Sequence, residues 1–378
     1  MTRQILGCRR LALSVGLSFA AAAAFAQAPG EKFRAQHAQL ANQFDSAFVS
    51  QAKMFEEIAA IDESPSARDA RDRFEKTLRM QASMSMAEMM AMMRTANNMH
   101  MHGPFEELES ALGREMTESL QASYSSAEIE GAYRNSPLPA RAVEVIRVGR
   151  EFESRLYDIL ADNLIQDKGA ALADAVQTYL ARSSSVPAKP KPARLLLEHP
   201  QAQAFKEGYP KLSGILWSAQ WLQLATLEAM IHEADDAHYW GSVDAVRERF
   251  RHKLAHGADM ASSTPVELPM APTIAPTLFS LSPEAAIVLD NLNMLETVLA
   301  DVLAYPNLRN KAAVMSSVVD EFTANADNVD TTIDYLASAL RGGIYNQGGP
   351  AIGELSESER NRSRMEMGMR HSMVMSAP

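Results

Sequence analysis

Cysteine is almost absent from this chain of 378 residues, which contains only Cys8. Cys8 falls inside a predicted N-terminal export signal, so the mature chain would contain none. A chain without cysteine has no disulfides, no thiolate nucleophile and no thiolate metal ligand. Its stability must come from a packed core, and a mature chain of about 350 residues is long enough for one or two cores.

The signatures of several common enzyme classes are missing as well. The sequence has no G-x-G-x-x-G, no P-loop and no G-x-S-x-G motif. It also shows no sustained alternation of polar and apolar residues and no Asn-Gly hairpin signal, which argues against β-strands. The sequence therefore predicts an all-α protein and nominates neither a nucleophile nor a general base. Whether the protein is an enzyme stays open.

The N-terminus has the three parts of a secretory signal peptide. Arg3, Arg9 and Arg10 precede an apolar run over residues 11–26, which ends in Ala-Phe-Ala. The run is shorter than the ~20 residues that span a bilayer as a helix, so no integral membrane anchor is expected. We predict cleavage near Ala26 and a periplasmic or secreted protein. Adjacent arginines leave the general secretory and twin-arginine routes both open.

Basic side chains are outnumbered by acidic ones. The chain has 36 Lys and Arg against 47 Asp and Glu, a formal net charge of −11. Loss of three arginines and no acid with the signal peptide takes this charge to −14. An acidic surface repels phosphate backbones, so nucleic acid is excluded as a main partner, whereas cations are favoured.

Apolar residues recur with helical spacing along the first half of the chain. Leu40, Phe44, Phe48, Phe55 and Ile58, for example, form one stripe. Such stripes with short connections predict long antiparallel helices in one or two bundles. We expect an N-terminal bundle over residues 27–183, with helices near 33–61, 65–97, 105–122, 138–165 and 168–182.

A run rich in serine and proline follows and predicts a linker over residues 184–194. A C-terminal helical domain is expected over 195–341, with one helix opening at Ser282-Pro283. Its other helices are predicted near 209–234, 241–257, 306–324 and 327–341. Arg341-Gly342 is a helix stop signal, so residues 342–378 are predicted to form a flexible tail.

Methionine is unusually frequent and concentrated in two segments. Nine of the 22 methionines lie between residues 80 and 101, and five lie between residues 365 and 375. Thioether sulfur suits Cu(I), and imidazole suits copper as well as zinc. The predicted metal ligands are Met99, His100, Met101 and His102, and, in the tail, Met365, Met367, Met369, His371, Met373 and Met375.

The tail segment, Met-Glu-Met-Gly-Met-Arg-His-Ser-Met-Val-Met, resembles the methionine motifs of bacterial copper-handling proteins. The resemblance is compositional and limited to this segment. It implies copper as the metal. Zinc or another divalent metal is the weaker alternative.

Methionines of the second predicted helix allow other interpretations. Met86, Met89, Met90 and Met93 share one helix face. Methionine with this spacing more often packs into a core, because it fills irregular gaps well. A methionine-rich face can also dock a protein partner or a second copy of the chain. Core packing, docking and metal contact all remain possible for this helix.

A second candidate metal site lies in the C-terminal half. Glu228, His232 and Asp236 share one helix face, and His252 and His256 are one turn apart on the next helix. Carboxylates and histidines on facing helices can bind a divalent ion.

The simpler interpretation of this region is a solvated surface. The helix that carries the two histidines is strongly charged, and its apolar face is Val246, Phe250 and Leu254. Trp217 and Trp221 on the preceding helix favour a packed core.

Three functions follow from these patterns. The first is metal handling, with copper as the expected ion. The second is a helical interaction or scaffold protein of the cell envelope, which would bind a partner or itself through its methionine-rich helix. The third is a helical metalloenzyme built on the histidines and carboxylates of the C-terminal half.

Overall fold

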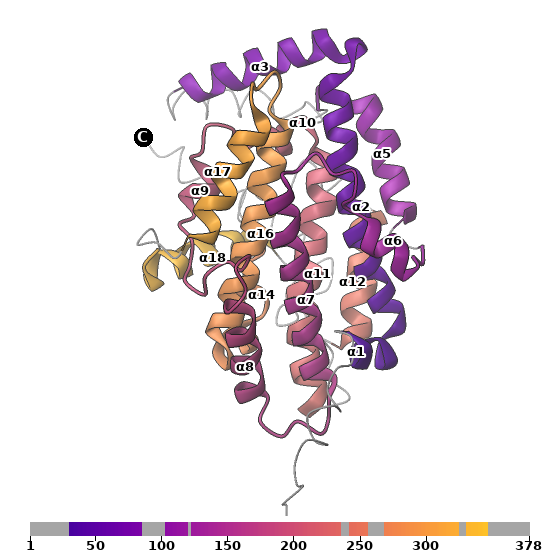
Figure 1. The fold of residues 1–378 in the computed structure, drawn as a ribbon, viewed down its shortest axis with the longest axis vertical. Coiled ribbons are helices and arrows are strands. Elements are labelled where there is room, and N and C mark those ends of the chain that lie inside the picture. The colour runs from indigo at the N-terminus through magenta and orange to yellow at the C-terminus, as the bar shows by residue number, and fades with distance from the viewer. Residues whose placement is uncertain are drawn as a thin grey trace, which may run out of the picture.

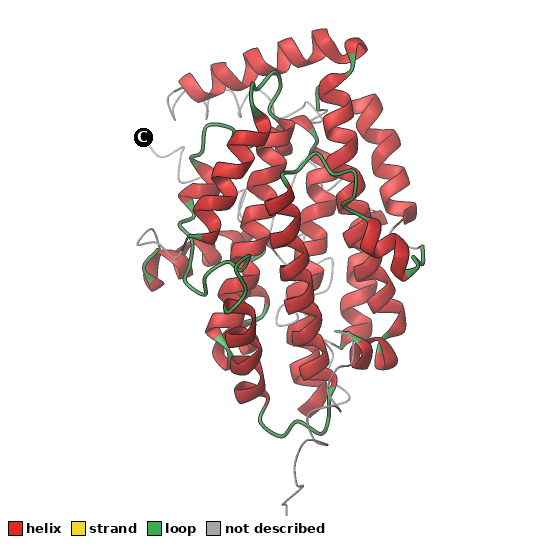
Figure 2. Cartoon of the chain, in the orientation of Figure 1, coloured by secondary structure: helices red, strands yellow, loops and turns green. Residues whose placement is uncertain are grey.

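The computed structural model describes residues 30–84, 103–119, 122–235, 242–255, 268–324 and 330–346. Helices account for nearly all regular structure in these ranges, and they contain no strand (Figure 2). The predicted all-α class is confirmed. Within the same ranges, no helix combines the length and the apolar character needed to cross a bilayer.

The first half of the chain contributes seven described α-helices and a 3-10 turn at Pro65–Ala67. The α-helices are α1 (Glu31–Gln36), α2 (Ala38–Glu63), α3 (Arg68–Ser83), α5 (Glu106–Ser119), α6 (Ser126–Gly131), α7 (Ala140–Ala161) and α8 (Lys168–Leu180). Helical periodicity predicted the long members of this set at these places. Their existence is confirmed, although α7 and α8 end two to four residues before the predicted bounds. Two predictions need larger corrections. The helix predicted over 33–61 is divided at His37 into α1 and α2, and the helix predicted over 65–97 is wrong in its length, because α3 ends at Ser83 and Met84 has an extended backbone.

The second half contributes four short and five long described helices, in two alternating groups of short and long. They are α9 (Arg194–Leu197), α10 (Ala204–Gly208), α11 (Pro210–Asp235), α12 (Val243–Ala255), α14 (Ala271–Ile274), α15 (Pro276–Leu281), α16 (Pro283–Ala304), α17 (Lys311–Thr323) and α18 (Thr332–Asn346). The short helices were not expected, because four to six residues are too few for a periodic pattern. The stop predicted at Gly342 is wrong, since α18 continues to Asn346.

Four long helices, α2, α7, α11 and α16, run side by side along the long axis of the molecule (Figure 1). The α3 helix lies across one end of them, at the top of the view. At the centre, α16 is buried on nearly every side, and Val288, Leu295 and Leu299 are fully enclosed. The predicted tryptophan core is confirmed too, because Trp217 and Trp221 are buried.

The segment predicted as a linker is packed against α16. Asn291 accepts a hydrogen bond from the Lys191 backbone at 3.0 Å and donates to the carbonyls of Pro187 and Lys189. Lys191 itself is only 2% exposed. The division into an N-terminal bundle and a C-terminal helical domain stays a prediction. In the structure, helices from both predicted halves surround the same interior.

Buried carboxylates bind the N-termini of helices that are distant in the sequence. Asp158 accepts from three backbone amides at the start of α1, and Glu109 accepts from two at the start of α11. Asp301 and Asp290 do the same at α10 and α14, which have no side-chain cap of their own. Each carboxylate satisfies amides that a helix leaves unpaired and complements its dipole.

Cationic side chains bind backbone carbonyls at the C-terminal ends of helices. Lys168 donates to carbonyls in the last turn of α7, and Lys191 donates to those of Glu321 and Ala324 at the end of α17. Arg71 and Lys311 act similarly at the ends of α2 and α16. Burial lowers the pKa of Lys168, Lys191 and Lys311. Their ammonium groups nevertheless satisfy carbonyls that would otherwise be buried without partners.

Candidate functional site

Both predicted methionine–histidine clusters lie outside the described residues. Residues 99–102, the helix-face methionines 86–93 and the tail 365–375 all fall in ranges that the structure does not describe. Metal binding by these clusters therefore stays a prediction, and so do core packing and docking by the methionine face.

The second candidate metal site is described only in part. Asp236 and His256 lie outside the described residues, as does the side chain of His252. Glu228 and His232 are placed, with Glu228 Oε1 3.2 Å from His232 Nε2. The shared helix face of these two residues is confirmed. Across the parts of the chain that are described, no group of three or more His, Cys, Asp or Glu side chains is placed to hold a metal ion.

Glu228 has a structural task where it lies. The residue is only 2% exposed, and its carboxylate accepts hydrogen bonds from the backbone amides of Thr277 and Leu278 at 3.0–3.1 Å. The Thr277 hydroxyl lies 3.0 Å from His232 Nε2. Glu228 thus caps the N-terminus of α15, which has no local side-chain cap. On α12, Val246 and Phe250 form the buried face that the sequence predicted.

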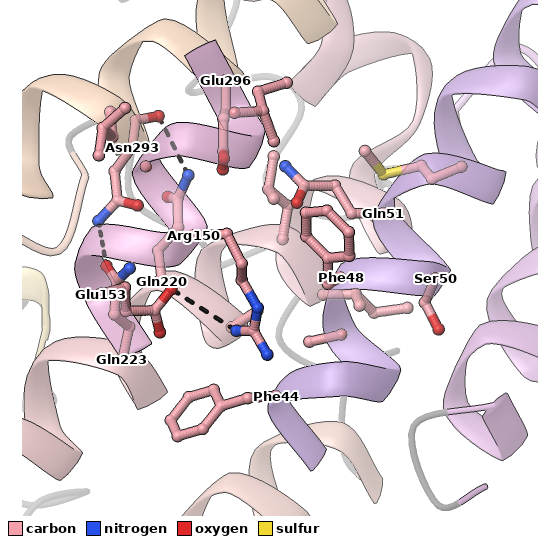
Figure 3. A pocket seen from close by; sticks show the side chains of 18 residues that line it. Phe44, Phe48, Ser50, Gln51, Arg150, Glu153, Gln220, Gln223, Asn293 and Glu296 are labelled. Atoms are coloured by element: carbon pink, nitrogen blue, oxygen red, sulfur yellow. Dashed lines mark hydrogen bonds and ion pairs between the residues drawn. The ribbon is translucent and has the colours of Figure 1, made fainter. Parts of the chain in front are cut away.

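A cavity of about 80 Å³ lies between the four central helices, and polar side chains from all four of them line it (Figure 3). A water molecule needs on the order of 10–15 Å³ of such space, so the cavity has room for several waters or a small polar ligand. Its polar lining consists of Ser50 and Gln51 of α2, Arg150 and Glu153 of α7, Gln220 and Gln223 of α11, and Asn293 and Glu296 of α16.

Gly149 allows α7 to come close to α16 at this level. A Cβ atom on Gly149 would lie 2.9 Å from both terminal methyl carbons of Leu292. Real Cβ atoms essentially never come this close to another atom, so a larger residue would move Leu292 or separate the helices. Because Arg150 follows Gly149 directly, the same close approach places its side chain in the cavity.

Arg150 is held among anionic and aromatic side chains. Its Nη2 donates to Asp45 Oδ1 at 2.9 Å, and its Nη1 lies 3.6 Å from Glu153 Oε2. The guanidinium carbon is 5.6 Å from the centre of the Phe48 ring, a cation–π distance. Figure 3 shows Arg150 between Glu153 on one side and Phe48 on the other. Asp45 also accepts from Arg34, so Arg150 shares its strongest partner with a second cation.

Glu296 is the least compensated carboxylate of the cavity. Burial raises its pKa to about 7, and the charge of Glu153 adds to the rise. The side-chain amide of Gln51 and the charge of Arg150 act in the opposite direction. No salt bridge and no backbone amide binds Glu296 within the described ranges. Tyr133, also nearby, has a pKa raised well above its usual value, mainly by burial and also by the charge of Glu296.

Amide side chains line the cavity and are only partly satisfied. Gln220 Nε2 donates to the Asn293 carbonyl at 3.1 Å, and Asn293 Nδ2 donates to Gln223 Oε1 at 3.0 Å. Gln220 Oε1 has no partner, although the residue is only 4% exposed. Ser50 Oγ is likewise buried without a partner. Buried polar atoms of this kind are rare in native proteins and indicate a position that a bound donor or water fills.

With Glu296 ionised, the cluster carries a net charge of −1. Asp45, Glu153 and Glu296 contribute three negative charges, and Arg34 and Arg150 contribute two positive ones. Because the site is partly shielded from solvent, such an imbalance attracts a cation more strongly than it would in bulk water.

Sequence reasoning did not identify this cavity. Arg150 and Glu153 lie one turn apart on α7, but Glu296 comes from α16 and only the packing brings it to them. One signal was present, because Glu296 follows Leu292 by four residues and thus lies on the apolar stripe of its own helix. A charged residue on a buried stripe indicates either a partner or a function.

The sequence matches no known protein-family model, and neither a curated protein nor a solved structure matches it at a significant level.

Proposed function

We propose that this protein binds a small cationic ligand in the cavity between α2, α7, α11 and α16. The observation that carries the proposal is the Glu296 carboxylate, which lines an amide-rich cavity and has no salt-bridge partner among the described residues. A predicted signal peptide would direct this binding activity to the periplasm or the medium.

The lining of the cavity favours a ligand that donates hydrogen bonds. Gln220 Oε1 is a buried acceptor without a partner, the unpaired Ser50 hydroxyl can accept as well as donate, and Glu153 and Glu296 add carboxylate oxygens. The amide nitrogen of Gln51 is a buried donor that also lacks a partner, and these acceptors outnumber it. An ammonium group has three N–H donors and one positive charge, so it can satisfy several of these acceptors at once. An anionic ligand would instead meet the uncompensated charge of Glu296.

Binding of a cation is expected to depend on pH. Ionised Glu296 attracts the ligand and neutral Glu296 does not, and the pKa of this carboxyl group is raised to about 7. Affinity should therefore be low at pH 5.5 and rise as the pH passes 7. A bound cation lowers the pKa of Glu296, so binding near pH 7 should release protons.

Methylammonium is the probe that tests the proposal. Titration of the mature chain at pH 8, followed by NMR, should shift the signals of Gln220 and Asn293 side-chain amides. Glu296→Gln, which removes the charge and keeps the shape, should weaken binding at least about tenfold. Glu284→Gln removes an exposed carboxylate of the same helix and should leave the affinity unchanged. Equal affinity in wild type and Glu296→Gln would refute the proposal, as would tighter binding of acetate than of methylammonium.

Metal handling through the methionine–histidine clusters is the second candidate function. It is supported by the sequence, in which fourteen of 22 methionines lie in two short segments that contain His100 and His371, and His102 directly follows the first of them. Copper is the expected ion because thioether and imidazole groups bind it well, and zinc or another divalent metal is the alternative.

Elemental mass spectrometry of the full mature chain after exposure to Cu(I), Cu(II) and Zn(II) tests the metal hypothesis. Substitution of the five tail methionines by leucine should lower the bound copper. Unchanged stoichiometry would remove the tail from the hypothesis. If neither a metal nor methylammonium binds, the interaction or scaffold protein becomes the favoured interpretation.

A further inference from the structure

A second and larger pocket adjoins the cavity. Its volume is about 320 Å³, and its walls come from α1, α2, α6 and α7. Phe44 and Arg150 line both pockets, so these two side chains form the boundary between them. We refer to the cavity that contains Glu296 as the inner pocket and to this one as the outer pocket.

The outer pocket has an aromatic wall. Phe33 stacks on Tyr157 with ring centres 4.6 Å apart, and Tyr157 stacks on Phe44 at 4.9 Å. The Tyr157 hydroxyl donates to the backbone carbonyl of Gln223 at 3.3 Å, so its polar end is satisfied by α11. Each of the three side chains is at most 5% exposed, so these preformed rings offer a ligand their edges as an apolar surface.

The rim of the outer pocket is charged and open to solvent. Glu130 and Glu151 are exposed, and the side chain of Arg34 is 47% exposed. Arg34 is bound to Asp45, and Arg182 is bound to Glu151 at 3.1 Å. The outer pocket is thus accessible to a ligand from solvent.

Arg150 can remain in place while a cation binds beyond it. Its contact with Glu153, at 3.6 Å, is longer than a hydrogen bond, whereas its bond to Asp45 is 2.9 Å long. An ammonium group between Glu153 and Glu296 would take over the weaker contact and leave the stronger one intact. The ligand would then pass between Phe44 and Arg150.

We propose that the two pockets form one binding site for a primary amine with a ring-sized apolar body, whose ammonium group lies in the inner pocket and whose body lies against the aromatic wall of the outer pocket. This inference rests on the proposed function, because it assigns the ammonium group to the same carboxylates. A quaternary ammonium ion fits less well, since it has no N–H to donate to Gln220 Oε1.

Four probe ligands separate the contributions that the ammonium charge and the apolar ring make to the affinity. They are 2-phenylethylammonium, ethylammonium, 2-phenylethanol and phenylacetate, titrated into the full mature chain at pH 8. We expect 2-phenylethylammonium to bind at least about tenfold more tightly than ethylammonium, because its ring buries additional apolar surface. The neutral alcohol and the anion should bind far more weakly than the ammonium with the same ring.

Two variants test whether the apolar part of the ligand binds in the outer pocket. Ser154→Leu on α7 and Ile129→Trp on α6 both fill the outer pocket, from different walls. Each should reduce the affinity for 2-phenylethylammonium to that of ethylammonium and leave the ethylammonium affinity unchanged. Ser317→Leu, at an exposed position of α17 away from both pockets, is the matched control. Agreement between the two variants rules out a local disturbance of α1, which approaches Ser154 at Gly30.

The possible failures are distinguishable. Equal affinities for the two ammonium ions would overturn the two-pocket ligand and leave the proposed function standing. An equal loss of both affinities in Ser154→Leu and Ile129→Trp would do the same. Tighter binding of phenylacetate would also overturn the inference. Failure of ethylammonium to bind the wild-type chain would instead remove the proposed function itself.

Discussion

Two carboxylates of α16, the buried Asp290 and the partly buried Glu296, differ in what they bind. Burial raises the pKa of each to about 7. Asp290 accepts from the backbone amide of Ala271 at 3.0–3.1 Å and from the Tyr335 hydroxyl at 2.6 Å. Glu296, less than two turns further along, faces a cavity, where the nearby amide of Gln51 and the charge of Arg150 only partly offset the effect of burial on its pKa.

A shifted pKa therefore does not by itself distinguish structural from functional carboxylates in this protein. Glu109 adds a third case, because its pKa is also raised to about 7 while it caps α11. The difference lies in the partners. Capping carboxylates bind backbone amides of the fold, whereas Glu296 retains acceptor capacity that a ligand can use.

Among the substitutions that test the difference between Asp290 and Glu296, Asp290→Ala should have the largest effect on stability. It leaves the Ala271 amide and the Tyr335 hydroxyl buried without their partner, and this should lower the free energy of unfolding by about 3 kcal/mol. Urea unfolding at pH 6 measures the loss, and Glu284→Ala at an exposed position of the same helix is the control. A loss below about 1 kcal/mol would show that this cap contributes little.

Glu296→Gln should change the free energy of unfolding in the opposite direction at high pH, so that the variant is more stable than the wild type. The pKa of Glu296 is about 7 in the folded chain and near 4.5 when unfolded, so its folded form prefers to be protonated. The resulting destabilisation is absent below pH 4.5, grows as the pH rises, and is complete above pH 7. Glutamine should raise the free energy of unfolding by about 2 kcal/mol at pH 8.

At pH 4.5 the same variant should have almost no effect. The quantity to follow is the difference between wild type and Glu296→Gln, because Asp290 and Glu109 contribute similar pH dependence to both chains. A difference that does not vary with pH would show that Glu296 is ionised or neutral throughout, and would contradict its assigned environment.

Gly149→Ala should have the smallest effect on stability. Alanine favours a helix by about 1 kcal/mol over glycine, but the new methyl group displaces the side chain of Leu292 at a comparable cost. We expect a net loss below about 1 kcal/mol by urea unfolding. Methylammonium affinity should fall severalfold, because Leu292 also lines the inner pocket. Gly113→Ala, where a Cβ meets nothing closer than 4.0 Å, should preserve that affinity.

The long helices could be predicted from the sequence because their signal is local. Apolar residues three and four positions apart define α2, α7, α11 and α16 without reference to the rest of the chain. The short helices α14 and α15 escaped prediction for the same reason, since their starts are fixed by Asp290 and Glu228 from other helices.

The candidate sites also show that a local pattern does not reveal contacts with distant segments. The Glu228–His232 pair was predicted from its spacing, and the two side chains do lie 3.2 Å apart. What the spacing could not reveal is that Glu228 binds the amides of Thr277 and Leu278, which are 49 and 50 residues away. The methionine–histidine clusters lie outside the described residues and stay predictions.

The sequence by itself determined the all-α class, the places of the long helices and the apolar stripes that bury them, because these depend on neighbours within one or two turns. Tertiary structure alone decided which charged residues meet. Arg150 and Glu153 are neighbours on α7, but Glu296 reaches them only when α7 packs against α16 beside Gly149. The physical reason is that the electrostatic environment of a side chain depends on burial and on partners from distant segments, which no local pattern encodes.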